Sequence, residues 1–120
     1  MPDLTGCLNY RYYTERLADP TLLDTALVTD SGDLAVPVGG TRRGGFTNVI
    51  SIAEGTRLLA RMRELPGQFP HPRFAYSWQA VEFGPEPPDD DEEAGRFYGY
   101  SEAAIRTFML RMQQLERKRS

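Results

Sequence analysis

The segment VPVGGTRRGGF, residues 36–46, combines residue types that can bind an anion. Two glycine pairs flank a threonine and two adjacent arginines. Glycine-rich backbone can present N–H groups in a concave nest, and arginine can hold phosphate or carboxylate through two parallel hydrogen bonds. The pattern therefore predicts an anion or acidic-partner contact at Gly40, Thr41, Arg42, Arg43 and Gly44.

The same segment does not fit the known nucleotide loops. Gly39 and Gly44 have the glycine spacing of a Walker loop, but Gly45 and Phe46 stand where that loop needs lysine and a hydroxyl residue. A dinucleotide-binding fingerprint needs a following helix, whereas FTNVIS is typical of a strand. The simpler alternative is a β-hairpin connection whose glycines allow positive φ and whose tip projects Thr41, Arg42 and Arg43 into solvent.

A second candidate site lies on an alternating segment, RFAYSWQAVEFG, residues 73–84. It predicts one strand with an aromatic face, packed under a helix. A pocket between this face and the helices would be lined by Tyr76, Trp78 and Glu82. Glu82 could act as a general acid or base there, or be no more than the exposed end of a strand.

Other catalytic chemistry has little support in the sequence. The one histidine, His71, lies between two prolines with no second catalytic group near it in sequence, and the one cysteine, Cys7, is better explained as a small structural thiol. Zinc sites need four ligands, mostly cysteine and histidine. We therefore predict no catalytic residue, no metal and no cofactor.

Local sequence signals predict the helices and strands around these groups. Helical spacing predicts a short helix over residues 8–18, and Asp19-Pro20 predicts a helical turn over 20–24. The segment 25–38 has a polar break typical of a hairpin, and 46–51 is a third strand. Ser51 and Glu54 form a capping box, in which each satisfies a backbone donor of the other, at the start of a helix that Pro66-Gly67 ends.

The C-terminal half carries an uneven charge. Residues 85–95 hold six acids and no base, and we expect an acidic, proline-rich, solvated loop there; a bound cation is the alternative. A helix over about 101–118 follows, with Ser101 as N-cap. Its apolar stripe is better explained by core packing than by a partner-binding face; the stripe consists of Ile105, Phe108, Met109, Met112 and Leu115.

These elements predict one α+β domain over residues 1–120. We expect a small antiparallel sheet of three to four strands with two to three helices packed on one face. The 120 residues carry a net charge of −3, and 13 of the 14 basic residues are arginine. No apolar run could span a bilayer and no secretory leader is evident, so we expect a cytoplasmic protein that contacts no membrane.

Two stretches, LAVPVGGTRRGGF and RFYGYSEAAI, resemble an uncharacterised family of short actinobacterial proteins of the Streptomyces type. The resemblance covers about residues 15–110. It implies a bacterial, cytoplasmic setting and a domain of unknown function. It supplies no activity, ligand or catalytic residue.

Three functions remain open, in this order. The first is a non-catalytic binding or regulatory protein that engages a protein partner, or a second copy of itself, through the arginine loop or the C-terminal helix. The second is a small enzyme or ligand-binding protein that uses the aromatic strand face. The third is nucleic-acid binding, which the acidity of the chain makes unfavourable.

Overall fold

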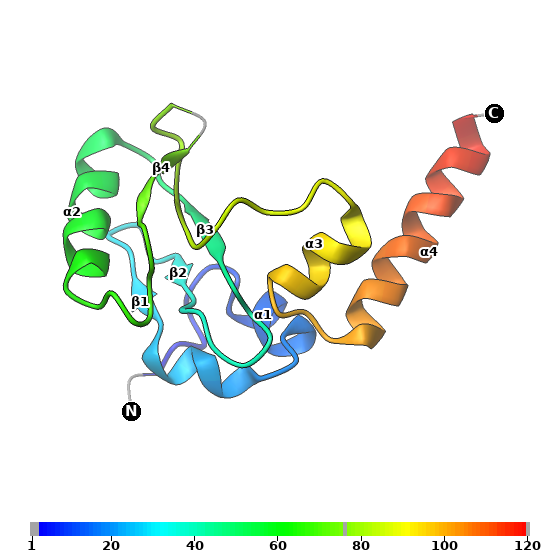
Figure 1. The fold of residues 1–120 in the computed structure, drawn as a ribbon, viewed down its shortest axis with the longest axis horizontal. Helices are drawn as coiled ribbons and strands as arrows, with labels where there is room; N and C mark the ends of the chain where they lie inside the picture. The colour runs from blue at the N-terminus through cyan, green and yellow to red at the C-terminus, as the bar shows by residue number, and fades with distance from the viewer. Residues whose placement is uncertain (1–2, 76, 120) are drawn as a thin grey trace.

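The computed structural model describes residues 3–75 and 77–119 and has the α+β class that the sequence predicts (Figure 1). Its helices are α1 (Tyr10–Arg16), the 3₁₀ helix η1 (Pro20–Thr25), α2 (Ile52–Arg63), α3 (Asp91–Phe97) and α4 (Glu102–Arg119). Its strands are β1 (Leu27–Val28), β2 (Leu34–Ala35), β3 (Gly45–Asn48), β4 (Arg73–Ala75) and β5 (Ala80–Phe83).

The strands divide into two small antiparallel sheets. β1 pairs with β2, and the other sheet has the order β3-β5-β4. A side-chain bond links the two sheets, because the hydroxyl of Thr47 on β3 donates to the main-chain oxygen of Leu34 on β2 across 3.2 Å. This bond holds β2 close to β3.

The predicted single strand over residues 73–84 is wrong, because the chain folds back on itself within it. Phe74 on β4 pairs with Val81 on β5, and Ala75 pairs with Ala80. Between them, Ser77 has a φ of 66°, a left-handed conformation typical of tight turns. Alternation of side chains is the same in one long strand and in two short ones, so the pattern alone could not reveal the turn.

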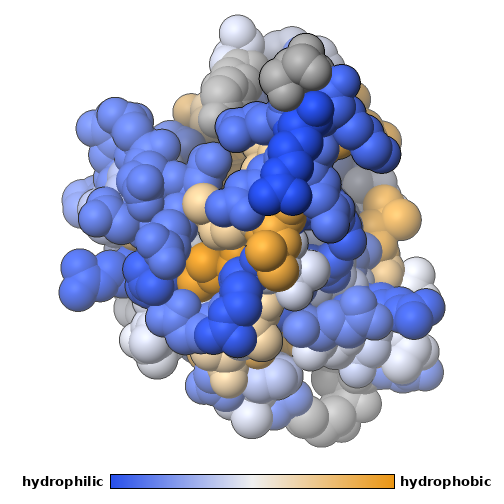
Figure 2. Space-filling view, turned by 90° about the vertical axis from the view of Figure 1, so that its right-hand side faces the viewer, coloured by the Kyte–Doolittle hydropathy of each residue, from blue (hydrophilic) through white to orange (hydrophobic). Residues whose placement is uncertain are grey.

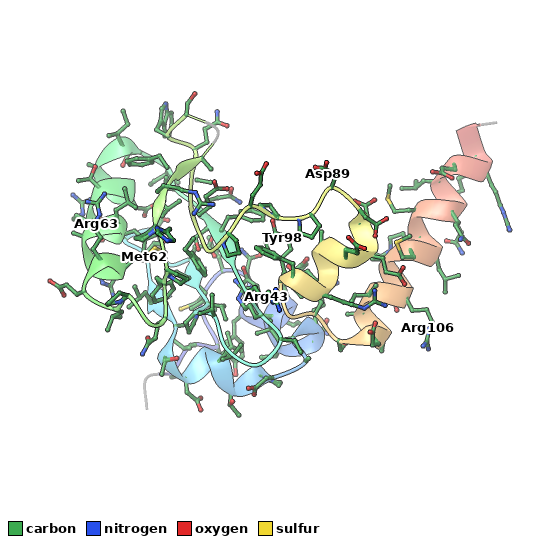
Figure 3. All side chains as sticks on the ribbon, viewed as in Figure 1. Arg43, Met62, Arg63, Asp89, Tyr98 and Arg106 are labelled. Carbon is green, nitrogen blue, oxygen red and sulfur yellow. The ribbon has the colours of Figure 1, made fainter. Side chains whose placement is uncertain are left out.

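Two hydrophobic clusters meet at β2. Leu34 and Val36 pack with Tyr13, Leu17 and other residues of the N-terminal region, whereas Ala35 packs with the cluster beneath α2. Successive residues of an extended segment point to opposite faces, so this segment contributes to both clusters. In α2, Met62 points toward the strands while Arg63 points outward (Figure 3).

The predicted capping box at α2 forms only in part. The hydroxyl of Ser51 accepts a hydrogen bond from the backbone N–H of Glu54, as expected. The Glu54 carboxylate, however, accepts from the N–H groups of Ile50 and Ser31 rather than Ser51. Glu54 is 2% exposed, so this buried carboxylate joins the start of α2 to the turn between β1 and β2.

The predicted acidic loop over residues 85–95 is helical in its second half. α3 begins at Asp91, and the side chain of Asp90 accepts a hydrogen bond from Glu93 N–H at 2.9 Å. The three acids of the first turn lie near the positive end of the helix dipole, which favours negative charge. The acidic run is therefore a helix start, and the irregular segment ends at residue 90.

α4 projects from the rest of the molecule (Figure 1). Ile105 is buried against α3, but Phe108 is 46% exposed and Leu115 is 47% exposed. The prediction that the whole stripe packs into the core is thus wrong. Figure 2, which faces this side of the molecule, shows an apolar patch surrounded by hydrophilic side chains. Among the described helices, none is long and apolar enough to cross a bilayer.

Candidate functional site

The arginine segment forms a tight turn rather than a protruding hairpin tip. The N–H of Gly39 donates to the oxygen of Arg42 at 3.0 Å, and the N–H of Arg42 donates back to the oxygen of Gly39 at 2.9 Å. Gly40, with a φ of 54°, and Thr41 are the two central residues, and this left-handed conformation favours glycine. The N–H of Arg43 then donates to the oxygen of Phe97, so the segment lies against α3.

The two arginines point to opposite sides. Thr41 and Arg43 are exposed as predicted, but Arg42 is only 3% exposed, so the prediction that it projects into solvent is wrong. The turn directs its side chain into the molecule. Gly99, with a φ of 78°, lies directly against it: a Cβ atom at that position would be 2.9 Å from the Arg42 Cα atom. The buried position of Arg42 thus depends on a glycine that is remote in sequence.

The Arg42 guanidinium is held by main-chain oxygens and aromatic rings. Its Nε donates to the oxygen of Val36 at 3.2 Å and its Nη1 to the oxygen of Tyr98 at 2.7 Å. The guanidinium carbon lies 5.8 Å from the Tyr13 ring centre and 5.9 Å from that of Phe83. Among the described residues, no carboxylate forms an ion pair with it. Arg42 is thus a buried cation without an anionic partner.

Burial lowers the pKa of the Arg42 guanidinium from its usual value, and the neighbouring phenol groups oppose part of that shift. An arginine side chain is not deprotonated in proteins under ordinary conditions, so Arg42 is charged. A buried charge without a partner is costly, and such groups are normally paired.

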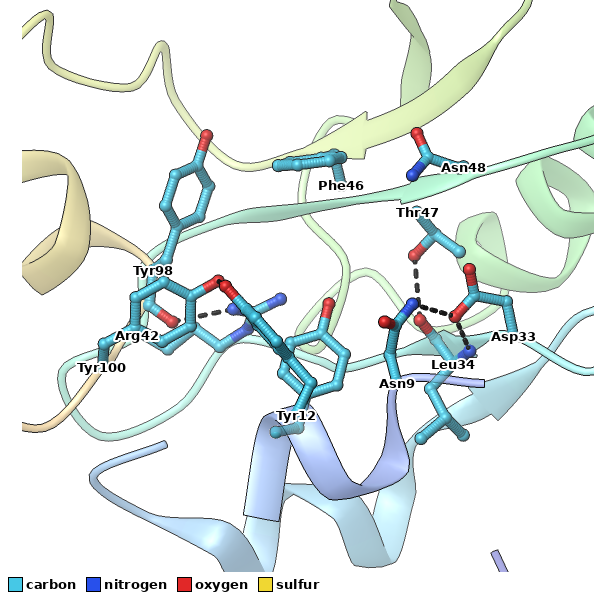
Figure 4. Close-up of a pocket in the computed structure, with 11 residues that line it drawn as sticks. Asn9, Tyr12, Asp33, Leu34, Arg42, Phe46, Thr47, Asn48, Tyr98 and Tyr100 are labelled. Carbon is cyan, nitrogen blue, oxygen red and sulfur yellow. Dashed lines mark hydrogen bonds between the residues drawn. The ribbon is translucent and has the colours of Figure 1, made fainter. Parts of the chain in front are cut away.

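Arg42 lines a pocket of about 150 Å³ between α1, the turn after β1, β3 and the segment after α3 (Figure 4). Its aromatic side chains are Tyr12, Tyr13, Phe46, Tyr98 and Tyr100. Its other lining residues are Asn9, Asp33, Leu34, Thr47 and Asn48. The mixture of rings and a few polar groups resembles small-molecule sites, although the volume is below the roughly 300 Å³ common for drug-sized ligands. A small ligand would fit.

Asp33 lies across the pocket from Arg42 (Figure 4) and is 7% exposed. Its Oδ1 accepts hydrogen bonds from the side-chain amide of Asn9 at 3.0 Å and from Leu34 N–H at 2.7 Å. Asn9 has a φ of 67°, an uncommon conformation outside glycine that asparagine tolerates better than most residues. These bonds fix the carboxylate at the pocket wall.

The tyrosines form one connected aromatic wall. The hydroxyls of Tyr12 and Tyr100 are 3.5 Å apart, and the ring centres of Tyr98 and Tyr100 are 6.1 Å apart. Burial raises the pKa of Tyr100 well above its usual value, and the Tyr12 hydroxyl adds to that shift. Burial also raises the pKa of Tyr13. These phenols therefore stay neutral at ordinary pH and act as hydrogen-bond donors and acceptors.

The remaining residues of the predicted loop line a separate hollow. Gly40, Thr41 and Arg43 face Pro88, Glu93, Arg96 and Phe97 there. Arg96 already pairs with Glu92 and Glu102. Gly44 is buried, and a Cβ atom there would lie 2.7 Å from the oxygen of Phe83. The structure thus brings the arginine segment next to the acidic one, although among the described residues Arg43 forms no ion pair with it.

Of the three residues of the pocket predicted on the aromatic strand face, the structure describes two, Trp78 and Glu82. Trp78 lies in the turn between β4 and β5 and is 40% exposed. Glu82 on β5 pairs with Arg73 at 3.0 Å, and Tyr76 lies outside the described residues. His71 is exposed in the segment before β4. Within residues 3–75 and 77–119, no three histidine, cysteine or acidic side chains gather as a metal site would require.

Sequence reasoning identified Arg42 but missed most of the pocket around it. Asn9, Asp33 and the tyrosines come from segments far apart in the chain. One signal was present: five of the six tyrosines lie in the two short segments YRYY and FYGY, and four of these five line the pocket. Such a concentration of phenols in two short segments was the available clue.

Comparison with known proteins gives a family but no activity. The model of a family of unknown function, DUF6302, matches residues 4–119. The chain belongs to the DUF6302 family. No curated protein and no solved structure matches this DUF6302 chain significantly. The family match thus agrees with the expected resemblance to an uncharacterised family and extends it over nearly the whole chain.

Proposed function

We propose that this DUF6302 protein is a non-catalytic binding protein that takes a small organic carboxylate in the pocket at Arg42. The observation that carries the proposal is the position of Arg42: a permanently charged guanidinium, 3% exposed, lines an accessible pocket and forms no ion pair with a described side chain. A bound carboxylate would supply the missing anion. Its bonds to arginine would be charge-assisted, the stronger kind of hydrogen bond.

The composition of the pocket supports an organic ligand over a bare inorganic ion. Five aromatic side chains line it, and aromatic rings contribute apolar area with little loss of conformational entropy on binding. The volume of about 150 Å³ restricts the ligand to a small molecule. A carboxylate on a short carbon chain or ring satisfies both requirements.

The pocket offers orientation rather than reaction chemistry. Its polar groups are one guanidinium, one carboxylate held by two hydrogen bonds, phenols, amides and a threonine hydroxyl that is bonded to main chain. No nucleophile beside a base is found among these lining residues, and that pairing is what covalent catalysis requires. The arrangement supports a binding or regulatory role. The resemblance to short actinobacterial proteins and the excess of arginine over lysine support a bacterial, cytoplasmic setting.

Titration of ¹⁵N-labelled protein with small carboxylates, some with and some without an amino group, tests this proposal. The panel is acetate, propionate, butyrate, glycine, β-alanine and γ-aminobutyrate, at constant ionic strength. We expect the NMR chemical shifts of the side-chain amides of Asn9 and Asn48 to change saturably with at least one of these six compounds. Sodium chloride should not reproduce them.

Two variants locate the binding group. Arg42→Met keeps much of the side-chain volume and removes the charge, so binding should be lost. Arg43→Met removes an equal charge from an exposed position in the same segment and should bind as the unaltered protein does. If no member of the panel shifts the pocket amides of the unaltered protein, the proposed function is wrong, whatever the variants do.

A further inference from the structure

The pocket holds a negative group as well as a positive one. The carboxylate of Asp33, 7% exposed, lies at the end opposite the guanidinium of Arg42 (Figure 4). Neither side chain forms an ion pair with a described residue. Two opposite charges therefore line the same pocket at its two ends and form no ion pair with each other.

The two oxygens of the Asp33 carboxylate differ in their hydrogen bonding. Oδ1 accepts from Asn9 and from Leu34 N–H, whereas Oδ2 accepts no hydrogen bond from the described residues. All side-chain nitrogen and oxygen atoms that are fully enclosed in the described structure have a partner. Oδ2 is therefore not fully enclosed, and Asp33 is one of the residues that line the pocket.

The guanidinium is divided in a similar way. Nε and Nη1 are bonded to main-chain oxygens, and arginine has five N–H donors in all. The Tyr13 phenol is a further side-chain hydrogen-bond partner of the guanidinium, and the proposed ligand would accept from N–H groups beyond these contacts. The two ends of the pocket thus carry charged groups of opposite sign.

A simple anion would satisfy only one of these ends. A carboxylate bound at Arg42 would meet the like charge of Asp33 in a confined space, where repulsion is stronger than in water. A ligand that carries an ammonium group at its other end would reverse that repulsion. The aromatic wall favours this arrangement too, because ammonium groups are attracted to the faces of tyrosine rings.

We propose that the ligand is a small amino carboxylate in its zwitterionic form, with its carboxylate on Arg42 and its ammonium on Asp33 Oδ2. This inference rests on the proposed function and narrows its substrate class. The bound pair of charges would be neutral overall, as the pocket is, and both buried groups would gain a partner in one binding event. The chain length between the two ligand charges sets the selectivity.

The carboxylate panel tests the inference by comparing members in matched pairs. Glycine differs from acetate, β-alanine from propionate and γ-aminobutyrate from butyrate by the amino group alone. We expect at least one amine-bearing member to bind about tenfold or more tightly than its partner, a difference that one well-placed buried charge contact readily supplies. The number of carbon atoms between the carboxylate and the ammonium of the tightest-binding compound then indicates the distance between the charges of Arg42 and Asp33.

Asp33→Asn then assigns the effect. Asparagine keeps an oxygen for Asn9 and Leu34 and replaces Oδ2 with a donor of nearly the same size. The amine-bearing ligand should lose about tenfold or more in affinity, while its amine-free partner should bind as well as before or better. Asp30→Asn is the matched control, because Asp30 lies in the same turn, is exposed and pairs with Arg57.

The outcomes separate the two proposals. Equal affinity within every matched pair, with saturable binding, would overturn the zwitterion and leave carboxylate binding intact. Absence of binding by all six compounds would overturn both. Should Asp33→Asn fail to fold, the matched-pair comparison on the unaltered protein still decides, because it needs no variant.

Discussion

The guanidinium of Arg42 donates to the main-chain oxygen of Tyr98 across 2.7 Å, and the two residues are 56 positions apart in the chain. This bond joins the glycine-rich turn to the segment between α3 and α4. It also places a fixed positive charge beside a wall of phenols. The candidate site of this DUF6302 protein is organised around that contact.

Loss of Arg42 should destabilise the fold. Arg42→Ala leaves a cavity and deprives the oxygens of Val36 and Tyr98 of their donors, so we expect the free energy of unfolding to fall by about 2–4 kcal/mol. Chemical denaturation followed by circular dichroism measures this loss. Arg43→Ala, at an exposed position, should change stability by less than about 0.5 kcal/mol. Equal effects of the two substitutions would contradict the buried position of Arg42.

Gly99 should not tolerate a side chain. A Cβ atom there would overlap Arg42, and the φ of 78° is unfavourable for other residues. Gly99→Ala should lower the free energy of unfolding by about 2 kcal/mol or more and weaken carboxylate binding together with it. Gly6→Ala is the control, because a Cβ atom there meets no atom within 4 Å. Thermal melting of both variants makes the comparison.

Glu54 should contribute to stability although it lies in no active site. Its carboxylate accepts hydrogen bonds from two backbone N–H groups, and the residue is only 2% exposed. Glu54→Ala leaves both donors unsatisfied, and we expect a loss of about 2–4 kcal/mol in unfolding free energy. Glu64→Ala, at the exposed end of α2, should be nearly neutral by the same denaturation measurement. If Glu54→Ala left the free energy of unfolding unchanged, those two N–H groups would have found other hydrogen-bond acceptors.

Stability should fall at alkaline pH. The pKa values of Tyr13 and Tyr100 are raised by burial in the folded protein, while in the unfolded chain they return to about 10. Below that value both states hold the proton and the stabilisation is complete. Above it the unfolded state alone releases protons, so the free energy of unfolding decreases as pH rises through the folded pKa values.

Melting temperatures measured between about pH 8 and 11 follow this decrease. Replacing both residues with phenylalanine removes the two phenols and should flatten the alkaline part of the profile. Near-ultraviolet absorbance of tyrosinate gives a second reading, because the two buried phenols should ionise after those of the unfolded chain. An alkaline profile that is unchanged in the double variant would refute the assignment.

The outer part of α4 should be dispensable for folding. Beyond Ile105 its apolar side chains are largely exposed, with Leu110 at 54% and Leu115 at 47%. A chain ended after Leu110 should keep its melting temperature within a few degrees, since little buried area is lost. Ile105→Ala, which removes the buried anchor against α3, should lower it clearly. A large loss on truncation would mean that this part of α4 packs against something in solution.

Much of the fold could be predicted because its signals are local. Ser51 marks the start of α2 and the proline-glycine pair after Leu65 marks its end, while Asp19-Pro20 marks the start of η1. Ser101 precedes α4, and its hydroxyl accepts a hydrogen bond from the N–H of Ala104. Each signal acts within one helical turn, through a cap or a fixed φ. The turn at Ser77 and the helix at α3 were missed because alternation and charge density fit more than one local structure.

The class of the fold, most helix ends and the glycine turn could be predicted from the sequence, which also named Arg42 as a candidate anion contact. The direction of the Arg42 side chain and the residues around it follow from contacts between distant segments. The direction of the Arg42 side chain depends on the close approach of Gly99 and on the hydrogen bond to Tyr98. The negatively charged residue in the same pocket is Asp33. Local backbone conformation depends on neighbouring residues, so a short sequence pattern can predict it. A pocket is formed by distant segments that come together only when the hydrophobic clusters pack. No short-range pattern predicts those long-range contacts.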